Sequence, residues 1–529
     1  MLTGKGLGSL FTAAAMMTTA LVSMPAWADV TLRINQVGDL AIVDPIMTTA
    51  NPTRDMAYMI WDTLFAMDAD FKVKPQMVRA YTVSDDKLVY TLTLRDGLKW
   101  SDGTPVTSAD CIASLSRWMA KDAMGKLLAK RLASMKAVDA GTFTLTLSKP
   151  FGMLLDVLGK AGAYVPFMMP ERLAKTPATE AIKEFVGSGP FMMKMNEWVP
   201  GSKVVYVKNP YYVPRNEPAS FLAGGKVAKV DRVERITFPD TISAVNAMLT
   251  GDLDYMENTP ADLLPLIKGS TEVRTYVRDP LGLNVQIVLN HKIPPTDNIK
   301  VRQAIQLSMG QEDFMTSLFG DRKDFYKICP AVFFCGTPLE TDVNSARVMT
   351  KDPKAAKALL KEAGYDGTPV LYIHDSDATL SEVIGTVAVQ DMRQGGLEVT
   401  DFVTDNATKF SRRANSGPVD QGGWNVFWTG WGGLDQMNPL TNVYALGSGK
   451  DAWFGWPTSS TLVDLREAYV DAQTQDERFE IAKKMQAEIN EIVTVIPMGQ
   501  FSNPVLESTR LDGMIPGAVS VFWNVSKSK

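Results

Sequence analysis

A strand–helix–strand order in the C-terminal half of the chain limits the fold more than any other feature. Residues 370–373 predict a strand, and residues 380–392 predict a helix that Gly395 and Gly396 end. Residues 397–399 predict the next strand. Because a helical crossover of this length joins parallel strands, we expect a parallel sheet here and an α/β fold class for the chain.

Other local patterns predict two helices and a crossing of the chain. Apolar residues between positions 56 and 65 recur at helical spacing, which predicts a helix over that range. Thr107 precedes another apolar stripe, and Asp110 three residues later favours the positive end of a helix, so we expect Thr107 to cap one. Residues 187–190, Gly-Ser-Gly-Pro, predict either a tight return of the chain between two domains or an ordinary loop.

Length and charge limit the organisation and the partners. At 529 residues the chain exceeds a single hydrophobic core, so two or three domains are expected. A net charge of -5 argues against a nucleic-acid partner, because proteins that bind nucleic acids carry a basic balance.

The N-terminus predicts export. Lys5 supplies a short positive region, residues 7–22 are apolar or small, and Ala26-Trp27-Ala28 forms an A-x-A cleavage site. We expect residues 1–28 to be a signal peptide that is cleaved after Ala28, leaving a soluble exported protein. No later segment resembles a membrane span.

Cysteines in an exported chain can form disulfides. Cys329 and Cys335 could close a small disulfide loop, and two buried free thiols are the alternative. Cys111 falls on a predicted amphipathic helix, so we expect it to be a core thiol.

Residues 423–439 form the stretch most suggestive of a ligand site. Residues 426–428 read as the end of a buried strand, and three glycines at positions 430, 432 and 433 then allow a close approach of the backbone to a ligand. This loop carries an indole, Trp431, and one carboxylate, Asp435. A flat apolar wall beside one anion suits a small solute that bears an amine.

The alternative is that the tryptophans of this stretch are core residues and that Asp435 caps a turn. For Trp428 the two interpretations are evenly balanced, whereas the glycines around Trp431 favour a pocket. We therefore predict a substrate-binding site formed by Trp431, Asp435, Trp428, Gly432 and Gly433.

The sequence offers little material for catalysis or metal binding. It contains no G-x-S-x-G, H-E-x-x-H or P-loop motif, and its two histidines, His291 and His374, are far apart. Two histidines without a paired cysteine motif also make a poor transition-metal site. We therefore expect a binding protein rather than an enzyme, without a metal or a cofactor.

An ordered set of motifs resembles the extracytoplasmic solute-binding proteins of family 5, which serve peptide, nickel and opine ABC importers. The motifs run across nearly the whole chain beyond the signal peptide, at residues 44–45, 61–65, 94–110, 187–191, 209–212 and 301–304.

The resemblance implies a periplasmic-binding-protein-like fold with two lobes and a hinge, plus an inserted extra domain. Domain I is expected to be discontinuous, over residues 29–72, 191–293 and 502–529. Domain II is expected to be the insertion at residues 73–190, and domain III to cover residues 294–501. The lobes are expected to close on the ligand by hinge motion and then to dock on a membrane permease.

The resemblance also implies roles for single residues. Trp431 matches a family tryptophan that lines the ligand cavity. Asp435 matches an aspartate that pairs with the α-amino group of a bound peptide, one residue further from the tryptophan than is usual. For a ligand carboxylate, Arg412 and Arg413 are candidates by proximity in sequence, and a solvated loop is the alternative for both.

The predicted function is that of a monomeric periplasmic protein of an ABC importer, which captures a di- or oligopeptide and delivers it to the permease. Within the same class, an opine, a glutathione-like compound, a sugar or a metal chelate is the alternative ligand. A secreted hydrolase or an interaction scaffold is the alternative of another class.

Overall fold

The computed structural model describes Met1 and residues 29–36, 38–377 and 379–528. Apart from Met1, the predicted signal peptide lies outside the described residues, and so does its cleavage after Ala28. None of the helices in the described ranges has the length and apolar character that a membrane span requires.

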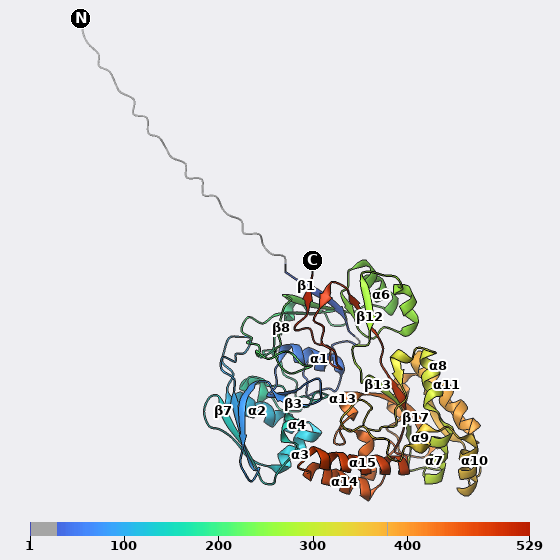
Figure 1. The fold of residues 1–529 in the computed structure, drawn as a ribbon. Coiled ribbons are helices and arrows are strands. Elements are labelled where there is room, and N and C mark those ends of the chain that lie inside the picture. Colours follow the sequence, from blue (N-terminus) through green and yellow to red (C-terminus); the bar gives the residue numbers. More distant parts are fainter. Residues whose placement is uncertain (2–28, 37, 378, 529) are drawn as a thin grey trace.

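Three larger sheets organise the described part of the chain, with seven, four and six strands (Figure 1). The seven-stranded sheet lies at the top of the view beside both ends of the folded chain. The four-stranded sheet lies below it on the side of β7 and α2, and the six-stranded sheet on the side of β13 and β17. We call the parts built on these sheets domains I, II and III.

The seven-stranded sheet of domain I combines segments from the start, the middle and the end of the chain. Its order is β12-β19-β11-β1-β10-β9-β8. The central strand alternates, with Leu32 and Ile34 fully buried, and it runs parallel to β10 and β11. The strands are β1 (Thr31–Asn35), β8 (Phe191–Met193), β9 (Lys203–Lys208), β10 (Arg232–Ile236), β11 (Tyr255–Met256), β12 (Val273–Tyr276) and β19 (Val505–Ser508).

Domain II is an antiparallel sheet covered by helices. The sheet order is β4-β5-β7-β6, with β4 (Val78–Val83), β5 (Val89–Leu94), β6 (Leu132–Ala137) and β7 (Thr142–Leu147). Its helix α2 (Ser108–Met119) begins with the expected cap: the Thr107 hydroxyl accepts from the Asp110 N–H, and the Asp110 side chain accepts from the Thr107 N–H. Cys111 on this helix is fully buried in the core, as predicted.

Domain III contains the predicted strand–helix–strand unit. β15 (Val370–Asp375) pairs in parallel with β16 (Val399–Thr404), and α11 (Thr379–Gln394) connects them. The sheet order is β14-β18-β13-β17-β15-β16, with β13 (Leu283–Leu289), β14 (Tyr326–Lys327), β17 (Val426–Gly432) and β18 (Val495–Phe501). The flanking helices include α7 (Ile299–Ser308), α8 (Gln311–Phe319) and α10 (Pro353–Glu362).

Strand β13 differs from the expected domain division. Residues 191–293 were assigned to domain I, yet β13 pairs with β17 and β18 in the sheet of domain III. The chain therefore passes between the two domains just before β13 and again between β18 and β19. Local sequence patterns did not indicate that β13 belongs to domain III, because the strands with which β13 pairs lie more than 130 residues away.

The helix predicted over residues 56–65 is also shifted. The structure has α1 (Asn51–Ile60), and Trp61 already adopts an extended backbone. Phe65 belongs to β2 (Phe65–Met67), which pairs with β3 (Val73–Pro75). The apolar stripe continues past the helix end because the following residues are buried as well, so hydrophobic spacing could not mark the boundary.

The Gly-Ser-Gly-Pro segment lies against the end of α1, in a close backbone crossing. The Gly189 N–H donates to the Ile60 carbonyl at 2.7 Å, and the Gly187 carbonyl accepts from the Ser101 N–H at 2.8 Å. A Cβ atom on Gly187 would lie 2.0 Å from the Ile60 carbonyl oxygen, a distance that no side chain tolerates. The crossing therefore requires glycine.

We expect Gly187→Ala to lower the free energy of unfolding by roughly 1–3 kcal/mol, because two backbones must separate to admit the methyl group. Urea unfolding followed by circular dichroism measures this change. Gly141→Ala is the matched control, since its Cβ would meet only the Asp139 carboxylate at 3.8 Å. Equal stability of the two variants would contradict the close crossing.

Candidate ligand-binding cleft

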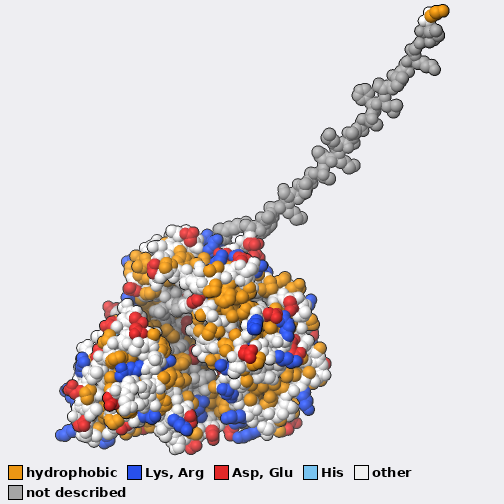
Figure 2. All heavy atoms as spheres, turned by 180° about the vertical axis from the view of Figure 1, so that it is seen from behind, with side chains coloured by type: hydrophobic (Ala, Val, Ile, Leu, Met, Phe, Trp, Pro, Cys, Tyr) orange, Lys and Arg blue, Asp and Glu red, His pale blue; other side chains and the backbone are white. Residues whose placement is uncertain are grey.

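A cavity of about 450 Å³ lies between domains II and III, and we call it the cleft cavity. Domain II lines it with residues of α3 (Ala123–Arg131) and α4 (Leu154–Leu158) and with residues 160–164. Domain III lines it with Trp431, with most of residues 434–443, and with residues of α14 (Ser460–Asp471) and α15 (Gln475–Ile492). Seen from behind, the surface is hollowed between the lobes (Figure 2).

The predicted glycine-rich loop turns directly from strand to helix. β17 ends at Gly432, and the short helix α13 (Gly433–Gln436) follows, between the lobes in Figure 1. Trp431 lines the cleft cavity at the end of β17, and its ring packs edge-on against Trp453 with 6.0 Å between centroids. The indole is therefore a wall of the cavity that Trp453 holds in place.

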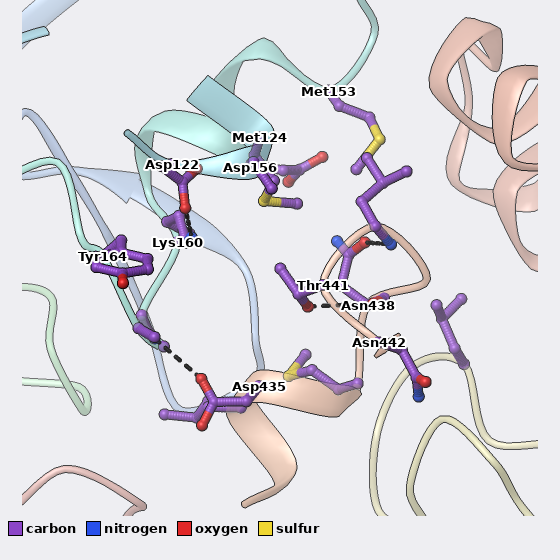
Figure 3. Close-up of a pocket in the computed structure, with 18 of the residues that line it drawn as sticks. Asp122, Met124, Met153, Asp156, Lys160, Tyr164, Asp435, Asn438, Thr441 and Asn442 are labelled. Carbon is purple, nitrogen blue, oxygen red and sulfur yellow. Dashed lines mark hydrogen bonds and ion pairs between the residues drawn. The ribbon is translucent and has the colours of Figure 1, made fainter. Parts of the chain in front are cut away.

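Asp435 projects from α13 toward domain II (Figure 3). Its Oδ1 accepts a hydrogen bond from the Ala163 N–H at 2.9 Å, which joins the two domains across the cavity. Among the described residues no cation forms an ion pair with Asp435, although Arg54 lies near enough to interact with its charge. The carboxylate thus faces the cavity without a direct counter-ion.

The other carboxylates of the cavity are compensated within the protein. Asp122 receives the Lys160 ammonium at 2.6 Å and caps α3 through the Gly125 N–H at 2.8 Å. Asp156 lies 3.6 Å from the Arg478 guanidinium. Burial raises the pKa of Asp156, and Arg478 opposes that shift. Asp435 is therefore the acidic group most available to a ligand cation.

The structure separates the five predicted site residues. Trp428 does not line the cleft cavity: its Nε1 donates to Asp375 at 2.7 Å, and the Lys409 ammonium lies 4.4 Å from its ring centre. Gly433 is buried against Leu281. Trp431 and Asp435 are together in the cavity wall, whereas Gly432 borders a second cavity.

This second cavity, of about 350 Å³, lies where domains I and III join, and Asp435 borders it as well. Its walls carry two buried ion pairs, Arg54 with Asp55 at 2.9 Å and Arg278 with Glu257 at 3.0 Å. Burial raises the pKa of Asp55 to about 6; Glu257 adds to this shift, while Arg54 and Arg278 oppose it.

The arginines suggested for a ligand carboxylate do not line the cleft cavity. Arg412 donates to the Gly423 carbonyl and lies 4.1 Å from the Phe402 ring centre, and Arg413 stacks on Phe410. The cavity instead contains Arg466, on α14. Arg466 is far from the glycine-rich loop in the sequence, so the sequence alone did not suggest that it lines the cavity.

Cysteines and histidines lie away from the cleft. Cys329 and Cys335 form a disulfide with 5.8 Å between their Cα atoms. His374 is buried beside Asp401, with 3.1 Å between Nδ1 and the carboxylate. Across the described ranges, no group of three His, Cys, Asp or Glu residues has an arrangement that could hold a metal ion.

Domains I and II form one lobe and domain III the other; a cavity lies between the lobes, and the chain passes twice between domains I and III. This arrangement defines the class of two-lobed ligand-binding proteins. Residues 72–454 match the family described as bacterial extracellular solute-binding proteins, family 5 Middle. This chain belongs to family 5 of the bacterial extracellular solute-binding proteins, and its function is to bind a solute.

Named relatives support the same assignment. The probable peptide ABC transporter periplasmic-binding protein y4tO of Sinorhizobium fredii is 34% identical over 504 residues, 95% of this chain and 94% of the relative. The glutathione-binding protein GsiB of Salmonella typhi is 26% identical over 424 residues, 79% of this chain and 78% of the relative.

Solved structures share the fold. CtaP of Listeria monocytogenes superposes with a TM-score of 0.78 at 20% identity, covering 95% of this chain and 100% of that one. DppA of Helicobacter pylori, in complex with the peptide STSA, gives 0.75 at 21%, covering 94% and 98%. AgaA of A. tumefaciens R10, in complex with agropinic acid, gives 0.74 at 21%, covering 94% and 99%.

Domains II and III also meet at the edge of the cleft through ion pairs. Asp471 at the end of α14 accepts from Arg131 and, at 2.7 Å, from Lys149, both of which belong to domain II. All three groups are at least partly exposed, so solvent and salt weaken the attraction.

We expect Asp471→Asn to shift the ligand-free protein toward a more open form, because two contacts between the lobes are lost. At about 0.2–1 kcal/mol for each of the two exposed pairs, the ratio of closed to open protein should fall roughly two- to thirtyfold. Small-angle X-ray scattering should show a larger radius of gyration, and high salt should have the same effect on the wild type. Superimposable scattering curves would contradict a role in closure.

We expect Asp55→Asn to change the pH dependence of stability. Because the folded protein raises the pKa of Asp55 to about 6, this group contributes most stability below about pH 4, and that contribution is lost as the pH rises through 6. Asn stays neutral, so the stability of the wild type relative to the variant should fall between pH 4 and 6.5, by at most about 1.4 kcal/mol per pH unit.

Urea unfolding across this pH range, with exposed Asp321→Asn as the control, measures the difference. A difference between wild type and Asp55→Asn that does not change with pH would show that Asp55 does not bind a proton more tightly in the folded state.

Proposed function

We propose that this chain is the periplasmic substrate-binding protein of an ABC importer and that its solute is a di- or oligopeptide. The observation that carries the proposal is Asp435, a carboxylate in the wall of an interdomain cavity with no ion-pair partner among the described residues. A peptide supplies the missing cation as its α-amino group. The resemblance to a probable peptide ABC transporter protein across 95% of the chain supports the same ligand class.

The remaining walls suit a peptide of varied sequence. Trp431, Leu434 and Met437 offer an apolar surface, while Asn438 and Thr441 offer polar groups (Figure 3). Such a mixture, with bridging water, accepts different side chains around a fixed charged terminus. The volume of about 450 Å³ falls within the usual range for small-ligand sites.

In this proposal the protein acts by capture and delivery, as a monomer, without catalysis. The signal peptide directs it to the periplasm and is removed after Ala28. The solute binds between open lobes, the lobes close, and the closed form docks on the permease. Closure would join Asp435 on α13 to the domain II backbone at Ala163, so the ligand amine and the interdomain contact would share one carboxylate.

A thermal-shift screen tests the ligand class with peptides, an opine, glutathione, sugars and nickel–histidine as probes. A ligand that binds only the folded state raises the melting temperature, and the rise grows with the logarithm of the ligand concentration over its Kd. Peptides should raise it most. The relatives that are named for glutathione or were solved with agropinic acid or Ni(L-His) make those compounds the competing outcomes.

We expect Asp435→Ala to weaken the binding of trialanine by about 2–5 kcal/mol, because a buried ammonium would lose its counter-ion. Isothermal titration calorimetry measures the change. N-acetyl-trialanine should bind wild type and variant equally weakly, and exposed Asp321→Ala should bind trialanine like the wild type. Trialanine affinity within twofold of wild type would refute the role of Asp435.

A further inference from the structure

Domain II touches domain III at two places where a glycine of domain II lies directly against the other domain. A Cβ atom on Gly162 would lie 2.6 Å from the Asp435 carboxylate and 3.2 Å from the Leu434 carbonyl oxygen. A Cβ atom on Gly152 would lie 2.5 Å from the Ala472 carbonyl oxygen and 2.9 Å from the Cα of the next residue. We call these places the Gly162 contact and the Gly152 contact. Neither has room for a methyl group.

The backbone conformation at these two positions does not itself require glycine. Neither Gly152 nor Gly162 is among the glycines that have a positive φ, so an alanine would fit the local backbone. The absence of a side chain is therefore required by the neighbouring domain, and only while the two domains are in contact.

The segment that carries Gly162 is fixed from behind (Figure 3). The Trp118 indole on α2 donates to the Tyr164 carbonyl at 2.7 Å, and the Lys160 ammonium lies 2.6 Å from Asp122. Tyr164 has a left-handed backbone with φ 52°, which a bulky residue adopts only where the surrounding contacts impose it. This segment therefore cannot readily move back to admit a side chain at position 162.

The Gly152 contact is fixed on both sides. In domain II, the Arg131 guanidinium donates to the Pro150 carbonyl at 3.0 Å and lies 5.3 Å from the Phe151 ring centre. In domain III, a capping box at Thr474 closes the turn between α14 and α15, directly after the residues that face Gly152. The fit between two such rigid segments is decided by shape, because neither can shift enough to admit a methyl group.

These contacts differ from the ion pairs at the edge of the cleft. The exposed pairs of Asp471 with Arg131 and Lys149 act over a range of distances and weaken with salt. Close packing has no such range, because repulsion rises steeply once atoms overlap. The ion pairs can draw the domains together, whereas the glycine contacts fix the one position in which they stop.

We propose that the inserted domain II is a clamp that closes on domain III, and that Gly162 and Gly152 are the positioning residues that let it reach the closed position. The proposal rests on lobe closure in the proposed function and is independent of which solute is bound. It gives domain II a direct part in capture, because the segment that Gly162 allows to approach closes over Asp435.

An alanine variant tests the clamp by small-angle X-ray scattering, without ligand and with each probe of the thermal-shift screen at saturation. Gly152→Ala should lower the ratio of closed to open protein at least about fivefold and enlarge the radius of gyration, because the methyl group meets fixed backbone. Gly141→Ala, also in domain II, should scatter like the wild type, since its Cβ would meet only the Asp139 carboxylate at 3.8 Å. Circular dichroism should show the same secondary structure for both variants.

A double variant tests the Gly162 contact. The methyl group of Gly162→Ala meets a carboxylate, which can turn away only by losing its hydrogen bond to Ala163. Gly162→Ala should therefore lower the closed-to-open ratio much less in an Asp435→Ala background than in the wild type, whereas Gly152→Ala should have the same effect in both. An equal effect of Gly162→Ala in both backgrounds would contradict the contact.

Hydrogen exchange at Ala163 distinguishes movement of the domains from a local defect. The Ala163 N–H is bonded to Asp435, and neither residue is among those nearest to a Cβ at position 152. Gly152→Ala should nevertheless speed exchange at Ala163 relative to Gly141→Ala, because opening separates both contacts together. The Kd of any probe that binds should rise as well, since the closed form is the one that holds it. Unchanged exchange would show that the two contacts do not act as one clamp.

The outcomes separate this proposal from the peptide function. If no peptide binds while Gly152→Ala still opens the protein, the peptide function fails and the clamp stands. If trialanine binds and both glycine variants close around it as the wild type does, the function stands and the clamp fails. A wild type that stays extended without ligand and with every probe would also overturn the clamp.

Discussion

The proposed ligand site depends on a half-buried charge that has no direct counter-ion within the protein. In the wall between the lobes, Asp122 and Asp156 have cations beside them, but Asp435 has only the Ala163 N–H and the more distant field of Arg54. In the proposed function, a ligand amine supplies the missing charge. On that proposal the bound solute completes the cleft, which couples ligand binding to closure.

The path of the chain would allow the lobes to move when a ligand binds. Domains I and III are joined by two short crossings, before β13 and after β18, so one lobe can move relative to the other without breaking a sheet. Asp44, near the start of the chain, is fully buried and binds domain II. Its carboxylate accepts hydrogen bonds from the Arg117 guanidinium at 2.8 and 3.2 Å and from the Ile182 N–H at 2.9 Å. Breaking a buried pair of this kind is costly, so we expect domains I and II to move together as one lobe.

Much of the local structure could be predicted from the sequence. The Thr107 cap and the parallel pair β15 and β16 depend on residues that are neighbours in sequence, and they formed as expected. The predictions that differed concern boundaries and partners. The helix at 56–65 ends early because burial continues beyond it, and β13 joined domain III because its pairing energy comes from strands far along the chain.

By itself the sequence determined the α/β class, the family and the loop that carries Trp431 and Asp435. The class and the loop follow from the spacing of residues that are close in sequence, and the family follows from the order of the motifs. Only the tertiary structure decided which side chains share the cavity. It placed Trp428 against Asp375, left Arg412 and Arg413 outside, and brought Arg466 of α14 and Arg478 of α15 into the cavity wall. The reason is that a cleft between domains is lined by segments that are distant in sequence, and their meeting is fixed by how the lobes pack.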